Sequence, residues 1–115
     1  MKSVRENLNS FLSQKLFYLL LLILFLRIDL VFQNNTPTGG DMGAHIVAID
    51  TFIKDFIPNF QINGWSNDWF GGYPLYYFYF PLPAIITFFL NLVFPFGVAF
   101  KIMVVLSVIL IVYSI

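Results

Sequence analysis

The stretch 16-LFYLLLLILFL-26 decides the class of fold, because every residue in it is apolar or aromatic. Lys2, Arg5 and Lys15 precede it, a pattern that signal peptides and membrane anchors share. The residues that follow, 27-RIDLVFQ-33, are bulky or charged and offer no cleavage site of small residues. We therefore expect an uncleaved first transmembrane helix over about 11–32. Arg27 and Asp29 near its far end would snorkel to the interface or face a bundle interior.

The composition agrees with a membrane protein. Of 115 residues, 59% are hydrophobic and only 10% are charged. The absence of cysteine excludes disulfides and thiolate metal sites. The formal net charge is zero and no basic run occurs, so nucleic acid is not an expected partner. We expect an integral protein of the plasma or inner membrane, in contact with membrane lipid.

Two further apolar runs follow, over about 75–94 and, after 95-PFG-97, over about 97–115. Together with the first run they predict an all-α membrane protein with three transmembrane helices. The last run ends without a polar stop or a charged flank. We therefore expect residues 1–115 to be the N-terminal part of one polytopic membrane domain, inactive as a fragment.

The charges predict the orientation of these runs. The loop 33–72 carries several acidic residues against Lys54 alone, namely Asp41, Asp50, Asp55 and Asp68. Basic residues instead precede the first run, and Lys101 follows the turn after the second. The positive-inside rule then places the N-terminus and the turn 95–97 in the cytoplasm, with the loop 33–72 extracytoplasmic.

Within the loop, 38-TGG-40 breaks the chain and a helical pattern runs from Asp41 to about 57, before Pro58. Its apolar residues recur at spacings of three and four, at Met42, Ile46, Ile49, Ile53 and Phe56. This spacing predicts an amphipathic helix that lies on the outer membrane surface or packs on neighbouring helices. Asp41 and His45, four residues apart, would share one face of it.

The second half of the loop, 64-GWSNDWFGGYP-74, is rich in glycine and aromatic residues. Pro81 and Pro83 indicate that a regular helix begins near one of them and runs to about Phe94. Such a helix is too short for a full crossing, so part of 73–80 would lie at membrane depth without regular helix. Irregular backbone at that depth lines a cavity or is buried in protein, which suggests a pocket.

Each candidate residue has two interpretations. Asp41 either caps the free N–H groups of the helix or acts as a general base. His45 is a polar surface residue or a ligand-facing one, and the aromatic residues form an interface belt or stack on a sugar ring. We take Asp41 as the catalytic candidate. The substrate-binding candidates are His45, Trp65, Asp68, Trp69, Tyr73 and Tyr79.

The order "GGDMGAH", then "GWSNDWFGGYPLYYFYFPLP", then Lys101 resembles the opening of a bacterial and archaeal family of polytopic proteins. These are labelled 6-pyruvoyl-tetrahydropterin synthase-related membrane proteins and are similar to the GT-C glycosyltransferases. The resemblance covers about 38–101 and implies inverting transfer of a sugar from a polyprenyl-phosphate carrier to a cell-envelope acceptor. It implies Asp41 as general base, His45 in the same site and a donor cavity shaped by 69–83.

The resemblance leaves a divalent metal open as cofactor, because Asp41 has no carboxylate beside it. Two other classes of protein fit the same residues. One is a transporter or lipid flippase, in which the irregular segment lines a substrate path and the three-span pattern repeats. The other is a non-catalytic membrane subunit that uses the aromatic loop as an interface.

Overall fold

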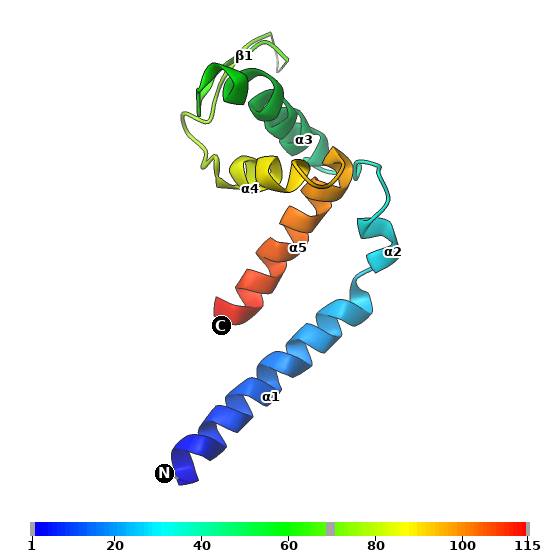
Figure 1. The fold of residues 1–115 in the computed structure, drawn as a ribbon, viewed down its shortest axis with the longest axis vertical. Coiled ribbons are helices and arrows are strands. Elements are labelled where there is room, and N and C mark those ends of the chain that lie inside the picture. Colours follow the sequence, from blue (N-terminus) through cyan, green and yellow to red (C-terminus); the bar gives the residue numbers. More distant parts are fainter. Residues whose placement is uncertain (1, 69–70, 115) are drawn as a thin grey trace.

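Two long helices run antiparallel, α1 (Lys2–Phe25) and α5 (Phe96–Ser114), so that both termini point toward the same end (Figure 1). The computed structural model describes residues 2–68 and 71–114. α1 is rich in leucine, a strong helix former, and contains no glycine or proline. Near the shared end, Lys15 Nζ donates a hydrogen bond to Tyr113 O at 2.7 Å and lies 5.5 Å from the Tyr113 ring centroid.

α5 is the one helix of the described residues that is long and apolar enough to cross a membrane. It has 19 residues and a mean hydropathy of 2.5. Its length, about 28 Å at 1.5 Å per residue, matches a hydrocarbon core of about 30 Å. The structure is otherwise mostly helical with a small two-stranded sheet, so the expectation of three transmembrane helices is wrong.

The first expected span, over 11–32, does not form one helix. α1 ends at Phe25, the chain bends, and a four-residue helix, α2 (Ile28–Val31), follows. Arg27 and Asp29 meet beside this bend, with Nε–Oδ1 2.9 Å and Nη2–Oδ2 2.7 Å, and both are exposed. The hydrogen bond from Arg27 holds the pKa of Asp29 below its usual value. The two charges therefore satisfy each other instead of facing a bundle.

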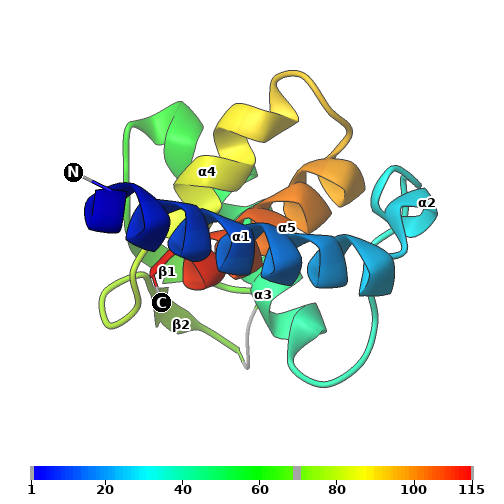
Figure 2. The same ribbon diagram turned by 90° about the horizontal axis from the view of Figure 1, so that it is seen from below.

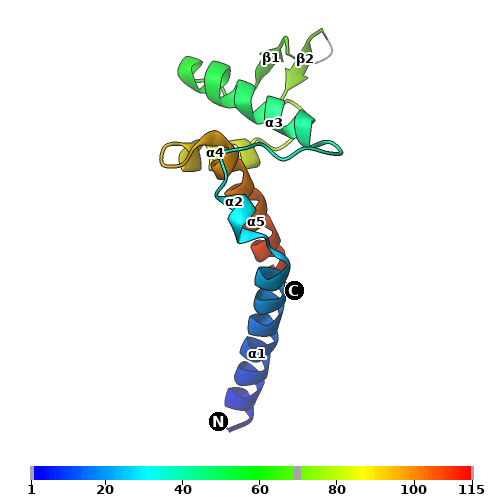
Figure 3. The same ribbon diagram turned by 90° about the vertical axis from the view of Figure 1, so that its right-hand side faces the viewer.

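Residues 33–95, called the head below, lie beyond one end of the α1–α5 pair (Figure 3). A helical run begins with α3 (Met42–Thr51), widens to the π-turn η1 (Phe52–Phe56) and ends with the 3-10 turn η2 (Ile57–Asn59). The run packs on neighbouring helices, because it buries Ile49, Phe52 and Phe56. The amphipathic helix expected here would lie on the membrane surface or pack on neighbouring helices, and the structure shows the packing on helices.

A hairpin follows, in which β1 (Gly64–Ser66) pairs antiparallel with β2 (Tyr73–Leu75). The chain then continues without regular structure to α4 (Leu82–Asn91), which begins directly after Pro81. Proline suits a helix start, since its fixed φ is already helical and its missing N–H would have no partner there. The head core joins the hairpin, the helical run, α4 and α5 through Ile49, Phe52, Phe56, Leu75, Ala84, Phe100 and Met103.

α4 lies across the upper end of α5 rather than beside it, as Figures 1 and 3 show. Its ten residues span only about 15 Å, half of what a crossing needs. The second expected span, over 75–94, is thus the end of a strand, an irregular segment and a short helix. The chain enters and leaves α4 at the same level.

The start of α5 is held against the segment that follows α2. Lys101 Nζ donates hydrogen bonds to Leu30 O and Gln33 O, both at 2.6 Å. One turn earlier, a Cβ on Gly97 would lie 2.6 Å from Asn35 O, so only glycine lets the two backbones approach so closely. The turn 95–97 therefore lies at the same end of the structure as the start of the loop 33–72, so the expectation that the two lie on opposite sides of a membrane is wrong.

Candidate functional site

Asp41 precedes the first residue of α3. Gly39 and Gly40 have φ values of 110° and 51°, which turn the chain into the helix. Asp41 has φ −88°, and its side chain makes no capping hydrogen bond. Its backbone carbonyl accepts the N–H of His45 at 3.2 Å. The helix start is therefore made by backbone, which leaves the exposed Asp41 carboxylate available for another role.

His45 is exposed and lies one helical turn after Asp41. Among the described residues, neither side chain has a hydrogen-bond or ion-pair partner. α3 is tilted relative to α4, and its first turn is the end that lies nearest to the level of α4 (Figures 1 and 3). Asp41 and His45 thus lie at the end of α3 that is closer to α4.

Asp68 joins the hairpin to the helical run. Its carboxylate accepts a hydrogen bond from Thr51 Oγ1 at 3.4 Å, and its N–H donates to Ser66 Oγ at 3.3 Å. Thr51 is 4% and Ser66 3% exposed, so each buried hydroxyl has a partner. These contacts give Asp68 a structural role. The sequence alone is compatible with either a turn residue or a ligand-binding residue at this position.

Trp65 lies on β1 and is 62% exposed. Its ring rests on Gly72, where a Cβ would overlap the indole, and its Nε1 donates to Asn67 Oδ1 at 3.2 Å. The cross-strand neighbour of Trp65 is Pro74. The indole therefore covers its own hairpin with one face and leaves part of its surface free.

The remaining candidates are spread out. Tyr73 is half-buried on β2 and packs against the head core, whereas Tyr79 is 69% exposed in the irregular segment before α4. Trp69 lies outside the described residues. The candidates thus occupy three places, namely the first turn of α3, the hairpin and the segment before α4. The single pocket suggested by the sequence stays a prediction.

Two apolar grooves lie along the α1–α5 pair instead. The upper one, of about 180 Å³, is lined by Leu26, Ile28, Val31 and Phe32 on one wall and by Ile102, Val105 and Leu106 on the other. The lower one, of about 490 Å³, lies between Phe25 and its α1 neighbours and Val112 of α5. Figure 2 views the pair from below, with α1 crossing in front of α5. Neither groove includes a predicted site residue.

A buried hydroxyl is the other chemical feature of the head. Tyr76 Oη is buried and has no hydrogen-bond partner in the described structure. Its ring packs edge-on against Phe52 with centroids 5.4 Å apart, and Tyr76 adopts φ 61°. Burial raises the pKa of the Tyr76 hydroxyl above its usual value, because the phenolate would lose its hydration.

For a metal, three or more histidine or carboxylate side chains would have to converge. Within the part of the chain that the structure describes, no such group occurs. Asp41 and His45 could still supply two ligands, and a divalent cation such as Mg²⁺ takes its remaining ligands from water or substrate phosphate.

The described residues form a mostly helical structure, and one of its helices is long and apolar enough to cross a membrane. No protein-family model matches the chain, and no curated protein or solved structure matches it. The resemblance to GT-C glycosyltransferases therefore rests on sequence motifs alone and stays a prediction.

Sequence reasoning missed the residues that fix the position of α5. In the sequence, Lys101 indicates an orientation and belongs to the motif order that carries the family resemblance, and Gly97 is part of a turn. A signal was present in the sequence, since Lys101 is the one charged residue in the apolar run 96–114. A lone lysine in such a run needs acceptors, which it finds here in backbone carbonyls.

Proposed function

We propose that this chain contributes the acceptor-activating part of a membrane glycosyltransferase. The enzyme would transfer a sugar from a polyprenyl-phosphate carrier to a cell-envelope acceptor. The observation that carries the proposal is the Asp41 carboxylate. It is exposed, makes no capping bond, and lies one turn from His45, which has no partner among the described residues, at the end of α3 nearest the level of α4.

The chemistry assigns one step to Asp41. Its carboxylate accepts the proton of an acceptor hydroxyl while that oxygen attacks the anomeric carbon of the sugar. The bond from that carbon to the carrier phosphate breaks, and the lipid phosphate leaves with the bonding electrons. His45 orients the acceptor or donates to a phosphate oxygen. Attack opposite the leaving group inverts the anomeric centre.

The upper groove supports a lipid-borne donor. Its walls are wholly apolar and come from α2, the residues that flank it and α5, which suits a hydrocarbon chain and disfavours a polar one. Phe32 lines this groove, and the segment 33–40 connects it directly to Asp41. A carrier tail in the groove would keep its phosphate on the side where Asp41 lies.

The proposal includes an orientation. α5 crosses the membrane, and the head with the loop 33–72 is extracytoplasmic, where lipid-linked sugars are used for envelope assembly. The basic Lys2, Arg5 and Lys15 belong to the end of α1 that lies away from the head, which supports this direction.

The test is sugar transfer in membranes that carry the protein as its cell makes it, with a radiolabelled polyprenyl-phosphate sugar pool. Wild type is compared with Asp41→Asn at equal protein level. Loss of transfer in Asp41→Asn supports Asp41 as base. Undiminished transfer contradicts it, and absence of transfer in wild type favours the non-catalytic subunit.

A further inference from the structure

α4 is apolar on its outer face as well as on its inner one. Ala84 and Thr87 are fully buried, both 0% exposed, and Ile85, Ile86, Phe88 and Leu90 pack partly buried against the head core. Leu82 and Phe89 face outward and are 60% and 62% exposed. α4 contains no charged residue. A helix whose outer face meets water instead carries charged or polar residues there.

Leu82 and Phe89 form a stripe on α4, because they are seven positions apart, a spacing of two turns that places both side chains on the same helical face. Val93, 78% exposed in the turn that follows α4, extends this stripe. Thr87, on another face, satisfies its hydroxyl within the helix by donating to Pro83 O at 2.8 Å. The helix therefore presents nothing polar along this stripe.

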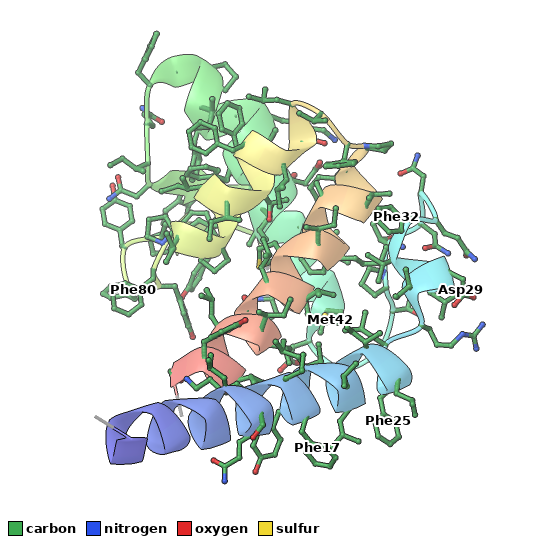
Figure 4. The ribbon with its side chains drawn as sticks, turned by 60° about the horizontal axis from the view of Figure 1, so that its bottom comes forward. Phe17, Phe25, Asp29, Phe32, Met42 and Phe80 are labelled. Carbon is green, nitrogen blue, oxygen red and sulfur yellow. The ribbon has the colours of Figure 1, made fainter. Side chains whose placement is uncertain are left out.

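The segment before α4 continues this surface. Four consecutive aromatic residues precede Pro81, and all are well exposed, namely Tyr77 at 59%, Phe78 at 79%, Tyr79 at 69% and Phe80 at 88%. In Figure 4 the Phe80 ring points away from the ribbon, with no other element beside it. A run of rings with two phenolic hydroxyls is typical of residues that lie at a membrane–water boundary.

The depth of this surface follows from α5. The length of α5 is close to the thickness of the hydrocarbon core, so a crossing α5 places its first turn at the boundary. That first turn is packed inside the head, where Gly97, Val98, Ala99 and Phe100 are buried. α4 lies across this same turn (Figures 1 and 3). α4 and the residues at its level therefore lie at the membrane–water boundary as well.

We propose that α4 and the aromatic segment Tyr77–Phe80 are immersed in the interfacial layer of the lipid bilayer on the side of the head. The stripe of Leu82, Phe89 and Val93 contacts acyl chains. The hydroxyls of Tyr77 and Tyr79 reach the headgroups. The occupant of the surface is lipid, because the surface is continuous with the crossing helix and presents no charge. This inference is independent of sugar transfer.

The test uses single cysteines, which the chain permits because it has none of its own. A fluorophore attached at Phe80→Cys or Phe89→Cys is compared with one at Phe60→Cys, after reconstitution of the whole chain in phosphatidylcholine vesicles. Phe60 is a matched control, since it is 98% exposed but directly follows η2, in the layer of the head above α4. Leu110→Cys on α5, 65% exposed, reports that reconstitution succeeded.

Lipids brominated near the headgroup end of their acyl chains should remove most of the fluorescence at positions 80 and 89. They should leave position 60 as bright as in unbrominated lipid. If position 110 is quenched while positions 80 and 89 match position 60, the surface faces water or another protein and the proposal is wrong. That outcome would leave the membrane crossing of α5 and the role of Asp41 untouched.

Discussion

Lys101 Nζ on α5 lies 2.8 Å from Asn35 Oδ1, although 66 positions separate the two residues in the chain. With the carbonyls of Leu30 and Gln33, the Asn35 amide completes three acceptors around one ammonium group. The contact fixes where α5 begins relative to the end of α2. It also holds both ends of the head, residue 35 and the turn 95–97, at the same end of the α1–α5 pair.

Replacing Lys101 by methionine should loosen this junction. Methionine keeps the length and the apolar stem but donates no hydrogen bond. Hydrogen bonds to a charged group contribute about 1.5–3 kcal/mol, so the free energy of unfolding in detergent micelles should fall by about that much. Circular dichroism during chemical denaturation measures it.

The control for that change is Lys54→Met. Lys54 forms an exposed ion pair with Asp50 at 2.7 Å, four residues apart on one helical run. Such pairs contribute about 0.3–0.5 kcal/mol. Equal effects of the two substitutions would show that the Lys101 contacts do not hold the junction.

Gly97→Ala should also destabilise the start of α5. The added Cβ would meet the Asn35 backbone, which cannot rotate away as a side chain can. Overpacking of this kind costs about 1–3 kcal/mol. Gly43→Ala in α3 is the matched control, because nothing lies within 4 Å of its added Cβ. It should be neutral or stabilising by up to about 1 kcal/mol, measured in the same unfolding experiment.

Tyr76→Phe should not destabilise the head, because it removes a buried hydroxyl that has no partner. The difference in the free energy of unfolding between wild type and Tyr76→Phe should also depend on pH. The folded-state pKa of Tyr76 is raised above the ordinary 10.0, so above pH 10 the unfolded chain releases the proton more readily than the folded one. The contribution of the neutral Tyr76 hydroxyl to the free energy of unfolding is fully present below pH 10 and is lost as the pH rises above 10.

Unfolding measured between neutral and alkaline pH checks this expectation. Wild type should lose stability above pH 10, and Tyr76→Phe should lose less. Tyr79→Phe, which changes a residue that is 69% exposed, should follow wild type. A Tyr76→Phe variant with the alkaline response of wild type would contradict burial of the hydroxyl.

Asp41→Asn should reduce sugar transfer by about 10²–10⁴-fold, the usual contribution of a general base. The fold should persist, since Asp41 makes no capping bond that asparagine would have to replace. Asp55→Asn is the control, because Asp55 is an exposed carboxylate in the same helical run. A similar loss of transfer in both variants would point to a general charge effect and remove Asp41 as the base.

The sequence predicted several elements well for clear physical reasons. Periodic apolar residues indicated a helix from Asp41 onward, and the structure has a helical run from Met42 to Asn59. Pro81 and Pro83 indicated the start of the short helix that is α4. These signals are local, because glycine, proline and side-chain spacing act within a few residues.

The number of membrane crossings could not be predicted in the same way. Hydropathy makes 75–94 look like a span, but it does not say whether an apolar segment crosses a bilayer or lies in its boundary. That choice depends on Lys101 and Gly97 meeting a segment more than 60 positions earlier, a relationship between distant residues. The scattering of Asp41, Trp65 and Tyr79 over three places is likewise set by packing, which residue types alone do not specify.

The most direct test of the account is a carbodiimide cross-link between Lys101 and the variant Asn35→Asp in membranes. The reagent joins an amine to a carboxylate only at contact distance, and wild type, with an amide at this position, is the control. Cleavage at methionine then separates residue 35 from residue 101 at Met42 unless the bond has formed. We expect the fragments of Asn35→Asp to remain joined and those of wild type to separate. Separation in both would mean that Lys101 does not contact residue 35 and would contradict the placement of both ends of the head at the start of α5.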